Sequence, residues 1–222
     1  FVERCEGCNL PVLNCLCPYK VTAESDAQVW LLTHRIEHYK PTNTGRLIGD
    51  VLAQTQVFTW HRTEPDVRLL ALLAQERFAP FVVFPDDQPD YADRVVSIDA
   101  VTQAKASGKT PVYILLDGTW RQARRIFRKS PYLDALPVLP LRTERQTRYR
   151  LRKPASSERV CPAEVAAELR RQGGDTDAAE VLDDYFEAFN ASYAASRLPT
   201  PHDTQPAPAS AQLAPVNAGL PR

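Results

Sequence analysis

The sequence contains no methionine, no long apolar run and no net charge. No stretch approaches the roughly 20 consecutive apolar residues of a membrane-spanning helix, so no contact with a membrane is expected. A secretory signal and an internal repeat are also missing. Because the chain starts at Phe1 and lacks methionine, we expect the natural amino terminus to lie upstream of it.

The 222 residues, 44% of them hydrophobic, suffice for one core of ordinary size. From about Pro199 onward the chain is rich in proline, alanine, glutamine and threonine, which is typical of disorder. We therefore expect a cysteine-rich segment over 1–20, an α/β domain over 21–195 and a disordered tail over 196–222.

The zero net charge conceals a strong local asymmetry. Residues 121–153 hold eleven lysines and arginines against two acidic residues, a net charge of +9 that the rest of the chain balances. A basic segment in a neutral protein favours a face that binds a polyanion. The alternative is an ordinary solvated helix face followed by a loop.

Four of the five cysteines lie within thirteen residues, with the spacing C-x2-C-x6-C-x-C. Zinc prefers four tetrahedral ligands, and thiolates bind it well. Two disulfides are the alternative, but they need an oxidising compartment, and nothing else in the sequence is typical of a secreted protein. We expect a closed, structural zinc site on Cys5, Cys8, Cys15 and Cys17. Whether this site also contacts RNA is left open. The protein is expected to be cytoplasmic.

Short apolar runs alternate with amphipathic segments along the domain, which predicts a mainly parallel sheet with helices on both faces. The prolines in 136–141 favour an extended loop with a short edge strand. The strands are expected at 29–33, 81–84, 95–98 and 112–116, and the helices at 46–53, 67–77, 101–107, 121–129, 161–172 and 177–192.

The most informative stretch is PVYILLDGTW at 111–120. An apolar strand ends at Leu116, and Asp117, Gly118, Thr119 and Trp120 follow it directly, ahead of a basic amphipathic helix. Ligands of open α/β sheets bind beyond the carboxyl ends of the strands. The polar residues therefore mark a candidate site, with helix capping by the aspartate and threonine as the simpler alternative.

A second strand end carries polar groups as well. The strand at 29–33 leads into His34 and Arg35, and Asn43 and Thr44 then precede a predicted helix. A helix amino terminus beside such side chains can bind an anion, although an ordinary N-cap is the commoner reason for them. The histidine, taken alone, also fits a structural role. Farther on, arginines surround Tyr149 within 142–153, and such a mixture suits phosphate contacts and base stacking.

Taken together, these pieces resemble the DTW-domain family over roughly residues 5–190, and Asp117-Gly118-Thr119-Trp120 is the motif that names the family. The resemblance is carried by the four cysteines, HRIEHYKPTNTGRL at 34–47, FVVFP at 81–85, LLDGTWRQARRIFRKSPYLDALP at 115–137, YRLRKP at 149–154 and CPAE at 161–164.

The resemblance implies a tRNA-uridine aminocarboxypropyltransferase. Such an enzyme moves the 3-amino-3-carboxypropyl group of S-adenosylmethionine to N3 of a uridine and releases methylthioadenosine. The variable-loop uridine at tRNA position 47 is the first expectation. The implied fold is SPOUT-like, with a trefoil knot in the carboxyl-terminal half, which is a rare exception to the rule against knots.

The resemblance also implies roles for residues. Asp117 is expected to deprotonate or orient uridine N3, or else to hold the amino group of the donor; Thr119 is expected to order the turn, and Trp120 to stack on the base or pack under the donor. The predicted donor-binding residues are His34, Phe84, Pro85, Leu116, Asp117, Gly118, Leu136, Leu139 and Leu141. The predicted RNA-binding residues are Arg35, Asn43, Thr44, Arg121, Arg124, Arg125, Arg148, Tyr149 and Arg152.

Two other functions remain open at this stage. A SPOUT-type RNA methyltransferase would use the same donor but transfer its methyl group. A non-catalytic RNA-binding module would use only the zinc segment and the arginines. For each we expect tRNA or another RNA as the partner, and a monomer is the favoured state.

Overall fold

A computed structural model describes residues 2–142 and 161–197. Within these residues the chain builds one five-stranded sheet in the order β2-β1-β4-β3-β5, and every pair of neighbouring strands is parallel. This confirms the predicted parallel α/β architecture and the short edge strand. The strands are β1 Gln28–His34, β2 Thr55–Trp60, β3 Phe78–Val83, β4 Thr110–Asp117 and β5 Val138–Leu139.

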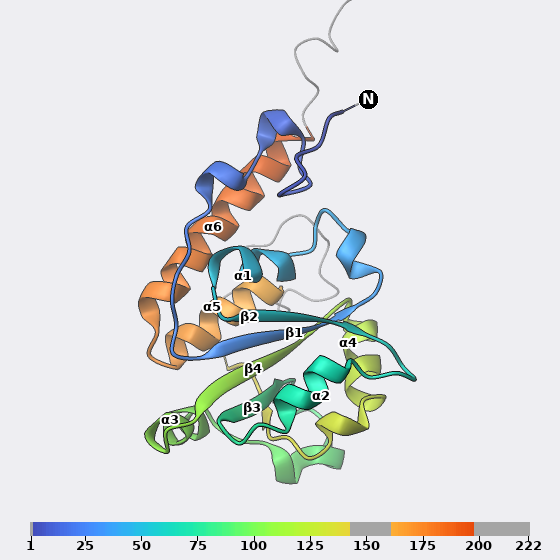
Figure 1. Cartoon of the computed structure of the whole chain (residues 1–222), viewed down its shortest axis with the longest axis vertical. Coiled ribbons are helices and arrows are strands. Elements are labelled where there is room, and N and C mark those ends of the chain that lie inside the picture. The colour runs from blue at the N-terminus through green and yellow to red at the C-terminus, as the bar shows by residue number, and fades with distance from the viewer. Residues whose placement is uncertain (1, 143–160, 198–222) are drawn as a thin grey trace, which may run out of the picture.

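Helices cover both faces of the sheet, as predicted. Figure 1 shows α1, α5 and α6 on one side of the strands and α2 and α4 on the other. The helices are α1 Gly45–Val51, α2 Val67–Leu73, α3 Asp99–Ala106, α4 Trp120–Arg128, α5 Pro162–Gln172 and α6 Thr176–Ala195.

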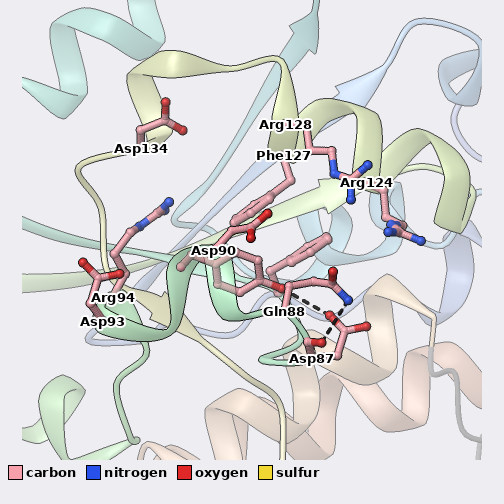
Figure 2. A pocket seen from close by; sticks show the side chains of 11 residues that line it. Asp87, Gln88, Asp90, Asp93, Arg94, Arg124, Phe127, Arg128 and Asp134 are labelled. Carbon is pink, nitrogen blue, oxygen red and sulfur yellow. Dashed lines mark hydrogen bonds between the residues drawn. The ribbon is translucent and has the colours of Figure 1, made fainter.

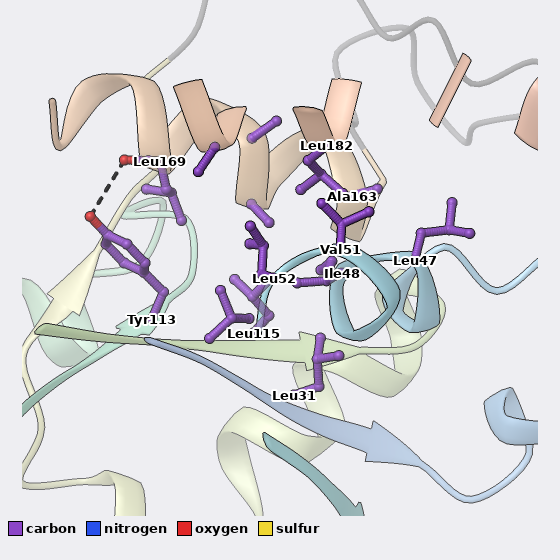
Figure 3. Packing of buried hydrophobic residues seen from close by; sticks show 14 of the residues in the cluster. Leu31, Leu47, Ile48, Val51, Leu52, Tyr113, Leu115, Ala163, Leu169 and Leu182 are labelled. Carbon is purple, nitrogen blue, oxygen red and sulfur yellow. Dashed lines mark hydrogen bonds between the residues drawn. The ribbon is translucent and has the colours of Figure 1, made fainter. Parts of the chain in front are cut away.

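The central strand β4 divides its side chains between two hydrophobic clusters. Tyr113 and Leu115 pack under α1, α5 and α6 (Figure 3), whereas Val112 and Ile114 face the cluster under α2 and α4. Successive side chains of a strand point to opposite faces, so an unbroken apolar run is what a strand buried on both faces requires. The tyrosine hydroxyl also donates to the Leu169 carbonyl at 3.4 Å and links β4 to α5.

Two elements differ from the prediction. The prediction of a strand at 95–98 is wrong. A 3-10 helix, η4, Pro89–Arg94, precedes these residues, and Val95 forms only an isolated bridge to Val138. Strand β2, with the sequence TQVFTW, was not predicted because it lies at the sheet edge and only two of its six residues are buried. An edge strand that mixes polar and apolar residues gives no apolar run to detect.

The cysteine-rich segment packs against α6. Short 3-10 helices η1, Val12–Asn14, and η2, Cys17–Tyr19, run beside that helix (Figure 1). Leu10 and Leu16 are fully buried in the same cluster as Phe186 and Phe189 of α6. The amino-terminal segment and the last helix are therefore joined through one shared core.

Several expectations stay predictions. The path of a knot in the carboxyl-terminal half depends on residues 143–160, which lie outside the described residues, as does the predicted tail from 198 onward. Among the helices of 2–142 and 161–197, none has the length and apolar character that crossing a bilayer would need.

Candidate functional site

The carboxyl ends of β1 and β4 lie next to each other, in the middle of the row formed by the strand ends. Thr33 of β1 lies opposite Asp117 of β4 in the parallel register, and its hydroxyl donates to Asp117 Oδ2 at 3.2 Å. The two strand ends that the sequence predicted as polar are therefore in direct contact.

The Asp117 carboxylate is buried, with 3% of its surface exposed. The Asn43 side-chain amide donates to both of its oxygens, at 2.9 and 3.2 Å, while the other end of that amide accepts from the Arg46 backbone at 3.1 Å. A Cβ on Gly45 would lie 2.7 Å from Asp117 Oδ2, so only glycine lets the start of α1 come this close. Asp117 thereby fixes the loop before α1 onto β4, a positioning role that the sequence did not predict.

Asn43 and Thr44, predicted to contact RNA, are also buried. Thr44 Oγ1 accepts from the backbone of Ala163 at the start of α5, at 3.5 Å. These contacts hold the beginnings of α1 and α5 beside the end of β4. A direct contact of either side chain with RNA stays a prediction.

The turn between β4 and α4 is closed by a capping box. Thr119 Oγ1 accepts from the Gln122 backbone at 3.3 Å, and Gln122 Oε1 accepts from the Thr119 backbone at 2.7 Å. Reciprocal bonds of this kind satisfy two donors of the first helical turn. Thr119 therefore caps α4 and orders the turn, as helix capping, the simpler alternative, required, and a catalytic role for it stays a prediction.

Gln122 also reaches the end of β1. Its amide nitrogen lies 3.2 Å from His34 Nδ1, and because its oxygen accepts from the Thr119 backbone, the amide donates to the imidazole. The His34 ring stacks on Trp60, with centroids 5.9 Å apart. Gln122 was missed from the sequence, where the capping-box spacing from the threonine was the available signal.

The environment of His34 favours its neutral form. Desolvation lowers the pKa of His34 below its ordinary value, and the charges of Arg125, Lys40 and Arg35 act in the same direction against the opposing charge of Glu37. Since Nδ1 accepts the amide hydrogen bond, the ring proton is assigned to Nε2.

Gly118 is the tightest point of the turn. A Cβ at this position would lie 2.8 Å from Gln122 Cβ and 3.6 Å from His34 Cβ. We expect Gly118→Ala to open the capping box and to destabilise the fold by about 1–3 kcal/mol. Chemical denaturation of the variant and the wild type measures the difference.

Gly49→Ala in α1 is the matched control, because the nearest atom to its added Cβ lies at 3.8 Å, in Thr55. This substitution removes a glycine from a helix and is expected to be neutral or to stabilise by up to about 1 kcal/mol. Equal stabilities of the two variants would show that the turn accommodates a side chain.

Trp120 belongs to a stack of aromatic rings. It lies nearly parallel to Phe84, with centroids 5.4 Å apart, and Phe84 stacks on Phe127 at 4.2 Å. The Arg124 guanidinium lies 5.9 Å from the centroid of the tryptophan ring. This arrangement links the end of β3 to α4 and leaves Trp120 half-buried.

The remaining predicted donor-binding residues lie in or near β3, β4 and β5, but they divide between the two faces of the sheet. Leu116 and Leu136 pack with the cluster under α4, whereas Leu139 and Leu141 pack with the cluster under α5. Pro85 is exposed. Their meeting in a single donor pocket stays a prediction.

A pocket of about 390 Å³ lies between η4 and α4 (Figure 2). Of the predicted residues it contains Phe84 and Arg124, and Asp117 is not in its lining. Tyr91 lies in its wall and donates to the Pro85 carbonyl at 2.6 Å. Burial raises the pKa of Tyr91 to about 12, so the hydroxyl remains a donor at neutral pH. The sequence did not predict this pocket.

The predicted RNA-binding arginines of the described part of the chain lie near the same sheet edge. Arg35 follows β1, and Arg121 and Arg125 lie on α4; all three are exposed. Lys40 adds a further cation and pairs with the buried carboxylate of Glu37 at 2.5 Å. Outside the described residues lie Arg148, Tyr149 and Arg152.

The four amino-terminal cysteines form a cluster that can hold a metal ion, with all four Sγ atoms within 4.8 Å of one another. The sulfur–sulfur distances are 3.7 Å for Cys5–Cys17, 3.7 Å for Cys8–Cys15 and 3.4 Å for Cys5–Cys15. Four thiolates at the Zn–S distance of about 2.3 Å in a tetrahedron lie about 3.8 Å apart, whereas a disulfide needs about 2.05 Å.

The electrostatics of the cluster also fit a bound cation. Backbone hydrogen bonds lower the pKa of Cys5 to about 6, whereas desolvation and the neighbouring thiols raise the pKa of Cys17 to about 12. Holding all four groups as thiolates at neutral pH therefore needs a compensating positive charge. A Cβ on Gly7 would lie 2.9 Å from Cys17 Sγ, which explains the glycine between Cys5 and Cys8. The donor set of four sulfurs is complete, which is the form of a structural site.

Comparison with known proteins places this geometry in a family. No solved structure matches the chain. The family model described as DTW domain matches residues 2–194, which include the cysteine cluster, the strand ends and both carboxyl-terminal helices. The chain therefore belongs to the DTW domain family.

Proposed function

We propose that this protein transfers the 3-amino-3-carboxypropyl group of S-adenosylmethionine to N3 of a tRNA uridine, with the uridine at position 47 of the variable loop as the first candidate. The observation that carries the proposal is the family match over residues 2–194, with the naming motif at a sheet edge where ligands of parallel sheets bind. Membership of the family is consistent with a tRNA-modifying role.

The reaction is a single displacement. The bond between uridine N3 and the donor carbon forms while the bond between that carbon and the sulfonium sulfur breaks. The uridine N3 proton leaves to a base, and the sulfur departs as neutral methylthioadenosine. Catalysis then requires alignment of the two reactants and removal of one proton.

The residues around the end of β4 suit these tasks. Asp117 supplies a carboxylate that Asn43 and Thr33 hold in place, and it serves as the proton acceptor or orients N3–H. A neutral His34 with its proton on Nε2 can donate to the carboxylate of the donor. Trp120, the last residue of the motif, contributes a half-buried aromatic face.

Finer features of the fold belong to the same proposal. We infer a SPOUT-type arrangement with a trefoil knot in the carboxyl-terminal half, a cytoplasmic location and a monomeric state. The metal on the four cysteines is inferred to be zinc, with a structural role, because four thiolates close the coordination sphere.

The proposal is tested by incubating the protein with tRNA and S-adenosylmethionine and analysing both products by mass spectrometry. The expected result is a uridine heavier by one aminocarboxypropyl group, together with methylthioadenosine. S-adenosylhomocysteine with a methylated nucleoside would instead support the methyltransferase. Stable tRNA binding with no product from either route would support a non-catalytic RNA-binding module.

Removing the exposed arginines of α4 is expected to reduce the salt dependence of tRNA binding. A phosphate that no longer pairs with a cation reduces the steepness of log K against log salt concentration by about 0.9. We expect Arg121→Ala and Arg125→Ala each to produce a decrease of about this size, measured by filter binding at several salt concentrations.

Lys109→Ala is the control, because this exposed cation precedes β4 and lies at the opposite edge of the sheet. Its slope is expected to equal that of the wild type. The RNA interface lies elsewhere if the α4 variants keep the full slope or if Lys109→Ala alone reduces it.

A further inference from the structure

The pocket between η4 and α4 has the volume and the aromatic lining of a site for a small ligand. Its volume of about 390 Å³ falls in the usual range of roughly 300–1,000 Å³. The rings of Phe84, Tyr91 and Phe127 line it, and each is at least 92% buried. Phe84 stacks on Trp120 of the motif, so a single ring separates the pocket from Trp120.

Three arginines and four aspartates line the pocket. Arg124 and Arg128, one turn apart on α4, lie together, and Asp87 and Asp90 come from the segment after β3, whereas Asp93, Arg94 and Asp134 lie away from the α4 arginines (Figure 2). Side chains four residues apart on a helix are neighbours, so the two guanidinium groups can hold one anion. Arg128 and Asp90 make no hydrogen bond or ion pair within the described part of the chain.

A third arginine of the pocket has a structural function. Arg94 donates to the carbonyl oxygens of Leu136 at 3.0 Å and Leu133 at 2.9 Å, and its guanidinium lies 5.5 Å from the centroid of the Phe127 ring. It therefore closes the wall of the pocket, and the available cations are those of α4.

We propose that this pocket binds one nucleotide of the RNA substrate other than the reacting uridine, with the phosphate on Arg124 and Arg128 and the base facing Asp87 and Asp90. Ionised carboxylates only accept hydrogen bonds, so the base edge must donate. The exocyclic amines of adenine, guanine and cytosine meet this requirement. Uracil has a single donor, N3–H, between two carbonyl oxygens that the carboxylates repel, so the pocket favours a base with an exocyclic amine over the base that is modified.

The link of this nucleotide to tRNA rests on the proposed function, whereas the pocket itself can be tested without any transfer reaction. Nuclear magnetic resonance titration of the full chain with 5′-AMP, 5′-CMP, 5′-GMP, 5′-UMP and inorganic phosphate provides that test. The first three are expected to shift the signals of Phe84, Tyr91 and Phe127. The affinities for 5′-UMP and for phosphate are expected to be at least about tenfold lower. Equal binding of all four nucleotides, or shifts elsewhere only, would overturn the proposal.

Two variants separate the two halves of the ligand. Arg128→Ala is expected to lower the affinity for all four nucleotides about equally, by roughly tenfold, because it removes a charge-assisted hydrogen bond to the phosphate. Asp90→Asn is expected to narrow the preference for 5′-AMP over 5′-UMP, since an amide both donates and accepts. Lys129 directly follows α4, is exposed and lies outside the pocket lining. Lys129→Ala is therefore the control and should bind the nucleotides as the wild type does.

Calorimetry with S-adenosylmethionine distinguishes this pocket from the donor site. Arg128→Ala and Asp90→Asn are expected to leave the affinity for the donor unchanged and, in transfer assays, to raise KM for tRNA without changing kcat. Loss of donor binding in these variants would assign the pocket to the donor and overturn the proposal. If nucleotides bind as expected but no transfer product forms with any tRNA, the pocket stands and the proposed reaction fails.

Discussion

Asp117→Asn is expected to lower the rate of aminocarboxypropyl transfer about a thousandfold while leaving tRNA binding near normal. The substitution keeps the shape of the side chain but removes the charge, and a positioned acid or base contributes roughly 10²–10⁴-fold. An asparagine oxygen at the Oδ2 position can still accept from Thr33 and Asn43, and only the longer bond from Asn43 to Oδ1 at 3.2 Å is lost, so the fold is expected to persist with a small loss of stability. Single-turnover transfer, tRNA binding and thermal unfolding measure the three properties.

Thr33→Val is the matched control for this variant. It removes the hydroxyl that donates to Asp117 at 3.2 Å and keeps the carboxylate. The expected loss of transfer is at most about tenfold, in line with one neutral hydrogen bond. Asp117→Ala is less informative, because it leaves the Asn43 amide buried without its acceptor.

The outcomes separate the roles of Asp117. A base or an N3–H acceptor predicts a large loss in Asp117→Asn and a small one in Thr33→Val. If the loss of transfer activity in both variants only follows their loss of stability, the role of Asp117 is limited to positioning the loop before α1. A non-catalytic RNA-binding module predicts that neither variant changes RNA binding or any cellular phenotype.

Cys5→Ser is expected to release the metal and to loosen the amino-terminal segment. A serine hydroxyl is a poor replacement for a thiolate, and metal binding in such sites is coupled to folding. The zinc content should fall from about one ion per chain to near zero. Amide hydrogen exchange should accelerate in residues 5–19 and on the side of α6 that covers Leu10 and Leu16.

Cys161→Ala is the control for this experiment. Cys161 precedes α5, its backbone donates to Glu164 at 3.0 Å, and burial raises the pKa of its thiol. It lies outside the four-sulfur cluster, so its replacement should leave the zinc content unchanged. An unchanged zinc content in Cys5→Ser would contradict the proposal that the four cysteines bind the metal.

Much of the fold follows from local patterns in the chain. The apolar run at 112–116 predicts a strand buried on both faces, and the structure extends it to Thr110–Asp117. Likewise, the cysteine spacing alone predicts a compact cluster of sulfurs, and the positions agree. These patterns are readable because each depends on residues close together in sequence.

The failures occur where distant segments decide the structure. Strand β2 has two exposed residues, Gln56 and Val57, in its first half and is held by pairing with β1, so its own residues carry a weak signal. Buried Arg170 was not predicted either. It donates from α5 to Ser25 at 2.6 Å and to the Ala27 carbonyl at 2.7 Å, and its guanidinium lies 5.5 Å from the centroid of the Tyr113 ring. These contacts with distant segments offset the cost of burying the charge.

For the candidate site, the sequence by itself determined which residue types end β1 and β4: an aspartate, a threonine and a tryptophan after one strand and a histidine after the other. Only the tertiary structure decided that the Asp117 carboxylate is covered by Asn43, that Gln122 contacts His34, and that a charged pocket opens beyond Phe84. The reason is physical: strand order and helix packing place these groups together across 74 to 88 residues of chain, and no local pattern encodes such distances.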